Sequence, residues 1–406
     1  MLATSLVATA LLIPSTPAVA APARKISYSE WDSAAALRAG SMRGAEVRRG
    51  RVVIAEKAAG TRTVAGRRYE TGRWTSPWRS AGFGLSELVS SWDAKTPGRS
   101  LVEISVRGRT ESGRRASWDV VAQWASGDKY LRRSSVGGQG DDLADVNVDT
   151  WQVGAAAGLA TYQVRVTLFR LPGGRGASLD SAGAVASRLT DVGDVALSKP
   201  RNGLGVRLAV PRYSQMIHDG HYPRYGGGGL VWCSPTSTSM VLGYYDALPR
   251  PRAYSWVPAG HPNPWVDNTA RATYDKRYGG TGNWAFNTAY AATRTGNAFV
   301  TRMRNLNEAG LFIAAGIPVV ATIEFGSGQL DGAPISSTAG HLVVIVGFTD
   351  EGDVIVNDPA APRNRGVRRT YDRGQFEDAW VGRKKGTAYV IADADHPLPK
   401  AAHGNW

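Results

Sequence analysis

The segment GGGGLVWCSPTSTSMVLGYY, residues 226–245, joins a run of four glycines to a stretch with helical spacing. Met240, Val241 and Tyr244 recur at intervals that place them on one side of a helix. Cys233, the only cysteine among 406 residues, stands where this helix begins. Unpaired N–H groups and the helix dipole favour a negative charge there, and such sites lower a thiol pKa from about 8.5 to roughly 3.5–7.5. The position therefore predicts a nucleophilic thiolate rather than a structural cysteine.

Residues 1–20, MLATSLVATALLIPSTPAVA, have the features of a signal peptide. They are apolar and uncharged, and they end in Ala18-Val19-Ala20, the small-x-small pattern of a cleavage site. No Lys or Arg precedes the apolar run, which leaves the true start codon open. We expect a secreted, extracellular protein. A lone cysteine there cannot form an internal disulfide, which again favours a catalytic thiol.

The composition limits the partners that we expect. The net charge is +14, but the arginines are scattered rather than grouped in a basic stripe with interleaved aromatic residues. We therefore expect no nucleic-acid partner, whereas the positive charge favours contact with anionic cell walls. No stretch after the leader is long and apolar enough to predict a membrane span.

Alternating strands predict an all-β sandwich domain over residues 28–172. In TYQVRVTLFRL (161–171), for example, Tyr162 and Val164 belong to an apolar face that alternates with a polar one. Residues 173–205 are rich in Gly, Ala and Ser and lack clear periodicity, so they are predicted to form a linker.

The remainder predicts an α+β domain over residues 206–392 and a C-terminal tail over residues 393–406. Helices precede a run of adjacent strands, which argues against alternating βαβ units. Besides the helix after Cys233, we expect helices at 283–296, 305–316 and 372–380 and strands at 317–325, 341–350, 353–358 and 387–393.

A catalytic triad follows from two of these strands. His341 begins one apolar strand, and the next strand ends in Asn357-Asp358 before a proline. If the strands pair antiparallel through the turn at 349–353, the end of the second lies near the start of the first. Asp358 or Asn357 can then bond the His341 ring, and Cys233 supplies the nucleophile.

Acyl transfer also needs hydrogen-bond donors for an oxyanion, and the candidates are the backbone N–H of Cys233 and the side-chain amide of Gln215. The segment HDGH offers His218 and His221 as two metal ligands with Asp219 between them, but no third ligand follows at a recognisable spacing. We expect a cleft-lining or solvated loop here, and no metal or organic cofactor.

These motifs resemble family thirty-nine of the cysteine peptidases, the bacteriocin-leader or double-glycine peptidases, which have a papain-like fold. The stretches that carry the resemblance are AVPRYSQ (209–215), WCSPTSTSMVLGYY (232–245), GHLVVIVGF (340–348) and VNDPAA (356–361). It is closest to secreted actinobacterial members with a β-rich N-terminal region. The resemblance implies a papain-like cysteine peptidase domain with Cys233 as nucleophile, His341 as general base, Asp358 as orienting carboxylate and Gln215 as oxyanion donor.

Two features depart from this family. Its glutamine lies only a few residues before the cysteine, whereas Gln215 precedes Cys233 by eighteen residues. The intervening segment would have to loop out and return, which the four glycines permit. The leader-cleaving members are joined to a transporter, and this chain has neither membrane spans nor a phosphate-binding loop. The resemblance therefore does not carry over their double-glycine specificity.

Three functions remain open at this stage. The first is an exported cysteine peptidase that acts on a peptide or protein substrate. The second is a peptidoglycan amidase or endopeptidase that uses the same thiol. The third is a non-catalytic cell-wall or carbohydrate-binding protein in which Cys233 is a small buried hydrophobe.

Overall fold

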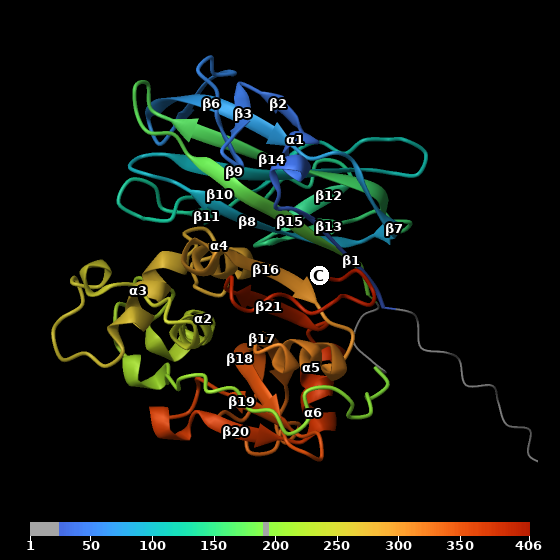
Figure 1. Ribbon diagram of the computed structural model, residues 1–406, viewed down its shortest axis with the longest axis vertical. Coiled ribbons are helices and arrows are strands. Elements are labelled where there is room, and N and C mark those ends of the chain that lie inside the picture. The colour runs from blue at the N-terminus through green and yellow to red at the C-terminus, as the bar shows by residue number, and fades with distance from the viewer. Residues whose placement is uncertain (1–23, 190–194) are drawn as a thin grey trace, which may run out of the picture.

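The structure, a computed structural model, describes residues 24–189 and 195–406 of the chain. An N-terminal β domain lies against a C-terminal domain of helices and strands (Figure 1). The signal peptide expected at residues 1–20 lies outside the described residues.

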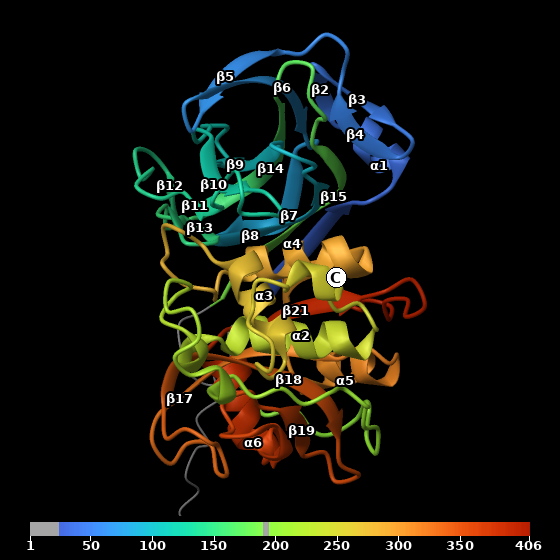
Figure 2. The same cartoon turned by 90° about the vertical axis from the view of Figure 1, so that its left-hand side faces the viewer.

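Two antiparallel sheets face each other in the N-terminal domain and enclose one hydrophobic core (Figure 2). The first sheet has the order β12-β13-β8-β15-β4-β3, with β1 beside β15. The second has the order β11-β10-β9-β14-β6-β2, with β5 beside β6 and β7 beside β14. The strands of the first sheet are β1 (Lys25–Trp31), β3 (Ala45–Arg48), β4 (Arg51–Ile54), β8 (Glu87–Lys95), β12 (Ala144–Asn147), β13 (Thr150–Val153) and β15 (Ser178–Arg188). Those of the second are β2 (Ser41–Arg43), β5 (Gly60–Val64), β6 (Arg67–Thr75), β7 (Arg79–Leu85), β9 (Leu101–Arg109), β10 (Asp119–Trp124), β11 (Ser134–Ser135) and β14 (Leu159–Arg170), and a short helix α1 spans Ala34–Arg38.

The alternation in β14 explains how the core forms. Tyr162, Val164, Val166 and Leu168 are fully buried between the two sheets, as their period of two predicts. Trp74, from the neighbouring strand β6, lies in the same core.

The linker predicted from residue 173 is wrong over residues 178–188, which form β15. This strand pairs with β1, β4 and β8. Ala182, Ala184 and Ala186 are buried in the core at a period of two. The prediction failed because β15 is built of Ala, Ser and Gly, which have weak strand propensity on their own.

The C-terminal domain contains helices and one antiparallel sheet with the order β16-β21-β17-β18-β19-β20. The helices are α2 (Cys233–Tyr244), α3 (Pro264–Thr273), α4 (Trp284–Thr295), α5 (Leu306–Ala314) and α6 (Arg373–Glu377). The strands are β16 (Asn297–Arg302), β17 (Val319–Phe325), β18 (Thr338–Phe348), β19 (Val354–Asn357), β20 (Arg368–Tyr371) and β21 (Thr387–Ala392). Pairing of β18 with β19 is antiparallel, with Val344 opposite Asn357, which confirms the predicted hairpin.

Helix α2 lies in the middle of this domain and is buried along most of its length. Met240, Val241 and Leu242 are fully buried, and they share a core cluster with Val344 of β18. The Ser237 hydroxyl donates a hydrogen bond to the carbonyl of Leu342 at 3.0 Å. The first turns of α2 are therefore fixed against the start of β18.

Helix α4 belongs to both domains. Ala285, Phe286 and Ala289 pack into the core of the β domain, and the rings of Phe286 and Trp92 lie 6.2 Å apart. The following turn, which includes Tyr290, packs into the core around α2. Figures 1 and 2 both show α4 directly against the sheet that contains β8. The two domains therefore share apolar surface along α4.

The C-terminal tail also packs against the body of the protein. Asn405 is fully buried, and its side-chain amide donates to the Arg302 carbonyl at 3.0 Å and to Glu308 at 2.8 Å. The backbone N–H of Tyr28 in β1 donates to the Gly404 carbonyl at 2.7 Å. The tail thus joins β1 to β16 and α5. In the described ranges, no helix has the length and apolar character needed to cross a membrane.

The substitution Phe286→Ala tests the shared core. We expect it to destabilise the protein by about 3–5 kcal/mol, because it leaves a cavity between α4 and the β domain. Urea unfolding of the full chain measures the effect, and the exposed Leu197, with 60% of its surface accessible, provides the control Leu197→Ala. Equal unfolding midpoints for the two variants would contradict the shared core.

Candidate active site

Cys233 is the first residue of α2 and follows a short 3₁₀ turn formed by Gly229–Val231. Its side chain is partly exposed, in contrast to the residues that follow it in the helix. The neighbouring Ser234 hydroxyl is buried and lies 2.9 Å from the hydroxyl of Tyr389. Together with the Ser237 hydrogen bond to β18, this contact holds the thiol at the exposed end of a fixed helix.

His341 and Asp358 form a buried pair beside this thiol. The ring Nε2 of His341 lies 2.8 Å from Oδ1 of Asp358, and the two side chains are 4% and 0% exposed. Asp358 engages Nε2, so Nδ1 is the ring nitrogen that remains for the hydrogen bond between His341 and Cys233. The hairpin of β18 and β19 creates the pairing, as the sequence predicted.

Asn357, the other candidate for bonding His341, has a different role. Its amide donates to the carbonyl of Pro211 at 3.0 Å, and its oxygen accepts from Arg368 at 2.6 Å. It therefore fastens the segment before Gln215 to the sheet.

Tyr371 is a residue of the site that sequence reasoning missed. Its hydroxyl donates to Oδ2 of Asp358 at 2.7 Å, while the backbone N–H of Ala360 donates to Oδ1 at 2.9 Å. Both carboxylate oxygens therefore have donors in addition to the His341 ring. No sequence signal pointed to it, because the strand that ends at Tyr371 was not predicted.

The pKa shifts in this cluster favour a thiolate–imidazolium pair. Burial alone would lower the pKa of His341, but the charge and hydrogen bond of Asp358, followed by those of Cys233, raise it to about 10. Burial alone would raise the pKa of the Cys233 thiol, but the His341 hydrogen bond and charge bring it below its ordinary value. Burial likewise opposes ionisation of Asp358, yet His341, Tyr371 and Ala360 together lower its pKa.

Gln215 lies next to the residues that lead into Cys233, despite the long insertion between them. Its side-chain amide donates to the Leu230 carbonyl at 2.6 Å, and its backbone N–H donates to Pro359 at 2.8 Å. Gln215 is therefore connected both to the turn before Cys233 and to the residue after Asp358.

The glycine run makes this return of the chain possible. Gly226, Gly227 and Gly228 have φ angles of 78°, 106° and 95°, a region that side chains disfavour. Gly229 passes so close to the His218 backbone that a Cβ would collide with it. The predicted loop-out and return of the insertion is confirmed.

Tyr278 lies near the thiol on a loop between α3 and α4. Burial and the charge of Cys233 both raise its pKa, although its side chain remains 50% exposed. The loop is fixed by the buried Asp275, which accepts from the backbone N–H of Ser135 in the β domain at 3.0 Å and from Asn283 at 2.9 Å. The β domain therefore helps to position one side of the site.

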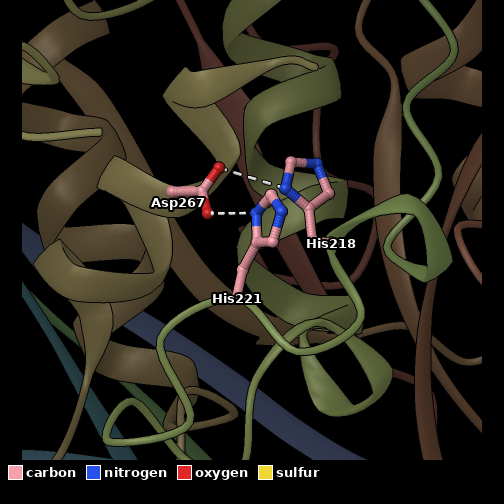
Figure 3. Close-up of side chains that lie close together, drawn as sticks. All are labelled: His218, His221 and Asp267. Atoms are coloured by element: carbon pink, nitrogen blue, oxygen red, sulfur yellow. Dashed lines mark hydrogen bonds and ion pairs between the residues drawn. The ribbon is translucent and has the colours of Figure 1, made fainter. Parts of the chain in front are cut away.

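A cleft-lining or solvated loop was expected at the HDGH segment, and the solvated alternative is wrong at its first histidine. His218 is fully buried, and both His218 and His221 face Asp267 of α3 (Figure 3). Asp219, which lies between them in sequence, is not part of this cluster. No third ligand was recognisable from sequence because α3 was not predicted, although Pro264 at its first position is a recognised start signal.

Alkylation of Cys233 tests the lowered thiol pKa. We expect iodoacetamide to modify the wild type well below pH 8, because the thiolate persists to lower pH than in an ordinary cysteine. The variant His341→Ala removes the hydrogen bond and the charge that most lower the thiol pKa and leaves burial opposed only by the backbone N–H groups of Ser234 and Leu342, so its rate at about pH 6 should fall at least tenfold, about one pKa unit. His396→Ala is the control, because His396 belongs to a different histidine–carboxylate pair: its Nδ1 lies 2.6 Å from Oδ1 of Asp393. Similar rates for all three proteins would refute the pairing.

Substitution of Tyr371→Phe tests its action through Asp358. Loss of the hydroxyl donor should raise the pKa of Asp358, so that this carboxylate is protonated at a higher pH and stabilises the imidazolium less. The acid limb of the alkylation profile of Tyr371→Phe should then move to higher pH. Its alkylation rate at neutral pH should fall less than its rate on the acid limb. Tyr130→Phe, at an exposed position, is the control, and an unchanged acid limb in Tyr371→Phe would be evidence against this role.

Comparison with known proteins gives two matches that follow the two domains. Residues 27–187 match the family model described as Peptidase C39 N-terminal domain, and residues 207–388 match the Peptidase_C39 like family. No curated protein matches the chain. Among solved structures, a peanut lectin with a 9mer peptide has a TM-score of 0.24 at 10% identity, over 41% of this chain and 99% of the lectin. A TM-score this low does not indicate a shared fold. With both models matched in order, the chain belongs to the C39-like peptidases that carry the family's N-terminal domain.

Proposed function

We propose that the protein is an exported cysteine peptidase with a papain-like α+β catalytic domain. Cys233 is the nucleophile, His341 the general base, Asp358 its orienting carboxylate and Gln215 an oxyanion donor. The observation that carries the proposal is the buried His341–Asp358 pair at 2.8 Å, bonded to a thiol at a helix N-terminus in a chain of a peptidase family. Export rests on the features of residues 1–20.

In the first half of the reaction, the Cys233 thiolate attacks the carbonyl carbon of the scissile peptide. The carbonyl π electrons move to oxygen, and the resulting oxyanion is met by the Gln215 amide and the N–H groups at the start of α2. His341, protonated at Nδ1, then gives its proton to the departing amine as the C–N bond breaks. The products of this half are a free amine and a thioester on Cys233.

In the second half, water replaces the amine. Neutral His341 takes a proton from the water as its oxygen attacks the thioester carbonyl. Collapse of this second tetrahedral intermediate expels the Cys233 thiolate and releases the carboxylate product. Asp358 keeps the imidazole ring oriented throughout and stabilises each imidazolium that forms.

Peptide cross-links of an anionic cell wall are a second candidate substrate. A cavity of about 730 Å³ lies where the two domains meet, and its lining is rich in basic residues: Arg51, Lys95, Arg133, Arg175, Arg271 and Arg294. The overall charge of +14 also favours an anionic polymer. The chemistry at Cys233 would be the same, so the two candidates differ only in substrate.

Carbohydrate binding by the β domain has less support. Trp74, Trp92 and Trp124 are in its core. Trp118 on the outer surface is covered by the Arg165 guanidinium, which lies 3.6 Å from the ring centroid. Trp78 is covered in the same way by Arg107 and Arg109. Sugars need an open aromatic face for stacking, which these two rings do not offer.

Hydrolysis assays with a peptide library and with purified sacculi test the proposal. Cys233→Ala and His341→Ala should each lower the turnover of the cleaved substrate by about 10⁴-fold or more. Gln215→Ala should lower kcat by about 10²–10³-fold with little change in KM, because its donor acts on the oxyanion rather than on bound substrate. If fragments are released from sacculi and no peptide of the library is cleaved, the substrate is the cell wall.

Gln375→Ala serves as the matched control, because that glutamine bonds Asp331 at the surface. Retained hydrolysis in Cys233→Ala would refute the nucleophile. A Gln215→Ala variant that matches Gln375→Ala in kcat would remove Gln215 from the oxyanion site and leave the triad in place.

A further inference from the structure

Outside the proposed catalytic residues, His218, His221 and Asp267 bring potential metal-ligating atoms together. One ligand atom from each lies within 4.8 Å of the other two. Nδ1 of His218 is 3.0 Å from Oδ2 of Asp267, and Nδ1 of His221 is 2.9 Å from Oδ1. Figure 3 shows both rings turned toward the same carboxylate.

Hydrogen bonds account for only part of this arrangement, namely the contact of His221 Nδ1 with Oδ1 of Asp267. His218 and Asp267 are both fully buried. Nevertheless, neither ring nitrogen of His218, nor Oδ2 of Asp267, has a hydrogen-bond partner among the described residues, although Nδ1 and Oδ2 are close. A buried polar atom without a partner costs about 1–3 kcal/mol. A cation shared by Nδ1 and Oδ2 would satisfy two of these atoms together.

We propose that His218, His221 and Asp267 bind a divalent transition-metal ion, and that Zn²⁺ fits best. Imidazole nitrogens and a carboxylate are ordinary zinc ligands, with bonds of about 2.0–2.2 Å. In a tetrahedral site, such bonds separate neighbouring ligand atoms by roughly 3.3 Å, close to the two nitrogen–oxygen distances of 3.0 and 2.9 Å in this cluster.

His261 lies next to this group but is not part of it. Its Nδ1 is 3.3 Å from Nδ1 of His221, and the two rings have centroids 4.2 Å apart, but only His218, His221 and Asp267 have ligand atoms that all lie within 4.8 Å of one another. The proposed fourth ligand is therefore water, as in zinc sites with three protein ligands.

The surroundings favour retention of a metal. Trp232 is fully buried with its ring centroid 6.1 Å from that of His218, and Val266 and Ala270 of α3 are buried in the same cluster of side chains. An apolar shell limits access of water to the ligands and lowers the local dielectric.

The position of the metal gives it a structural role. His218 and His221 belong to the insertion between Gln215 and Cys233, whereas Asp267 belongs to α3. A bound ion would therefore tie the insertion to the helical body of the domain. This consequence for Gln215 rests on the proposed function, but the metal site itself does not.

Zinc titration of the full-length protein in a Cys233→Ala background tests the site. Removal of the thiol prevents Zn²⁺ from binding at the catalytic residues, so the readout is independent of peptidase activity. After chelator treatment and dialysis, calorimetry should give one site, and saturating Zn²⁺ should raise the melting temperature. His218→Gln and Asp267→Asn should each weaken binding by at least about 100-fold, since loss of even an outer-shell partner costs about 10–100-fold.

His396→Gln provides the matched control, because it removes a histidine paired with a carboxylate elsewhere in the protein. Circular dichroism identifies any variant that fails to fold. X-ray absorption of the zinc-loaded Cys233→Ala protein reports the metal ligands without relying on those variants. Nitrogen and oxygen ligands with at least two imidazoles support the site. Absence of saturable binding, or equal affinity in Asp267→Asn and His396→Gln, would overturn it. Zinc binding without peptide hydrolysis by the protein with Cys233 intact would reject the proposed function alone.

Discussion

The hydrogen-bonded pair of His341 and Asp358 imposes the main physical constraint on the C-terminal domain. Burial of two charges is costly unless their geometry is good and the remaining lone pairs have donors. Here Tyr371 and the Ala360 N–H donate to the carboxylate, and the β18–β19 hairpin fixes the spacing between His341 and Asp358. The thiol of Cys233 completes the arrangement. When this thiol is ionised, its negative charge compensates the positive charge of the imidazolium from the side that Asp358 does not contact. A change to any donor therefore alters the protonation of all three groups, which titrate as one coupled unit.

The β domain contributes to this site through packing rather than through a catalytic group. Phe286 of α4 inserts into its core beside Trp92, and Asp275 is fixed by the Ser135 backbone N–H. Both contacts act on the segment that carries Tyr278 toward the thiol. The β domain is thus part of the scaffold of the site, and α4 should transmit a loss of stability in either domain to the other.

The parts of this protein that sequence could predict are those determined by local patterning. The alternation in β14, the apolar strands β17 to β19 and the position of Cys233 at a helix start all follow from neighbouring residues. The part that failed depends on contacts distant in sequence. β15 is made of small residues, and its strand conformation is stabilised by pairing with β1 and β8 on either side. Likewise, no local pattern links Tyr371 to Asp358, because their contact arises only when β20 pairs with β19.

The insertion between Gln215 and Cys233 is attached to the sheet at its start, where the Gln215 N–H donates to the Pro359 carbonyl, but the residues in its middle must also be held in place. Three successive glycines with positive φ allow the chain to turn back, but they also raise the entropic cost of ordering that segment. The oxyanion role proposed for Gln215 nevertheless requires that its donor be held in a precise position. The hydrogen bond from Gln215 to Leu230 joins the two ends of the insertion to each other. In its middle, His218 and His221 face Asp267 on α3, an element outside the insertion. A metal ion at that point would supply the rigidity that the glycines remove.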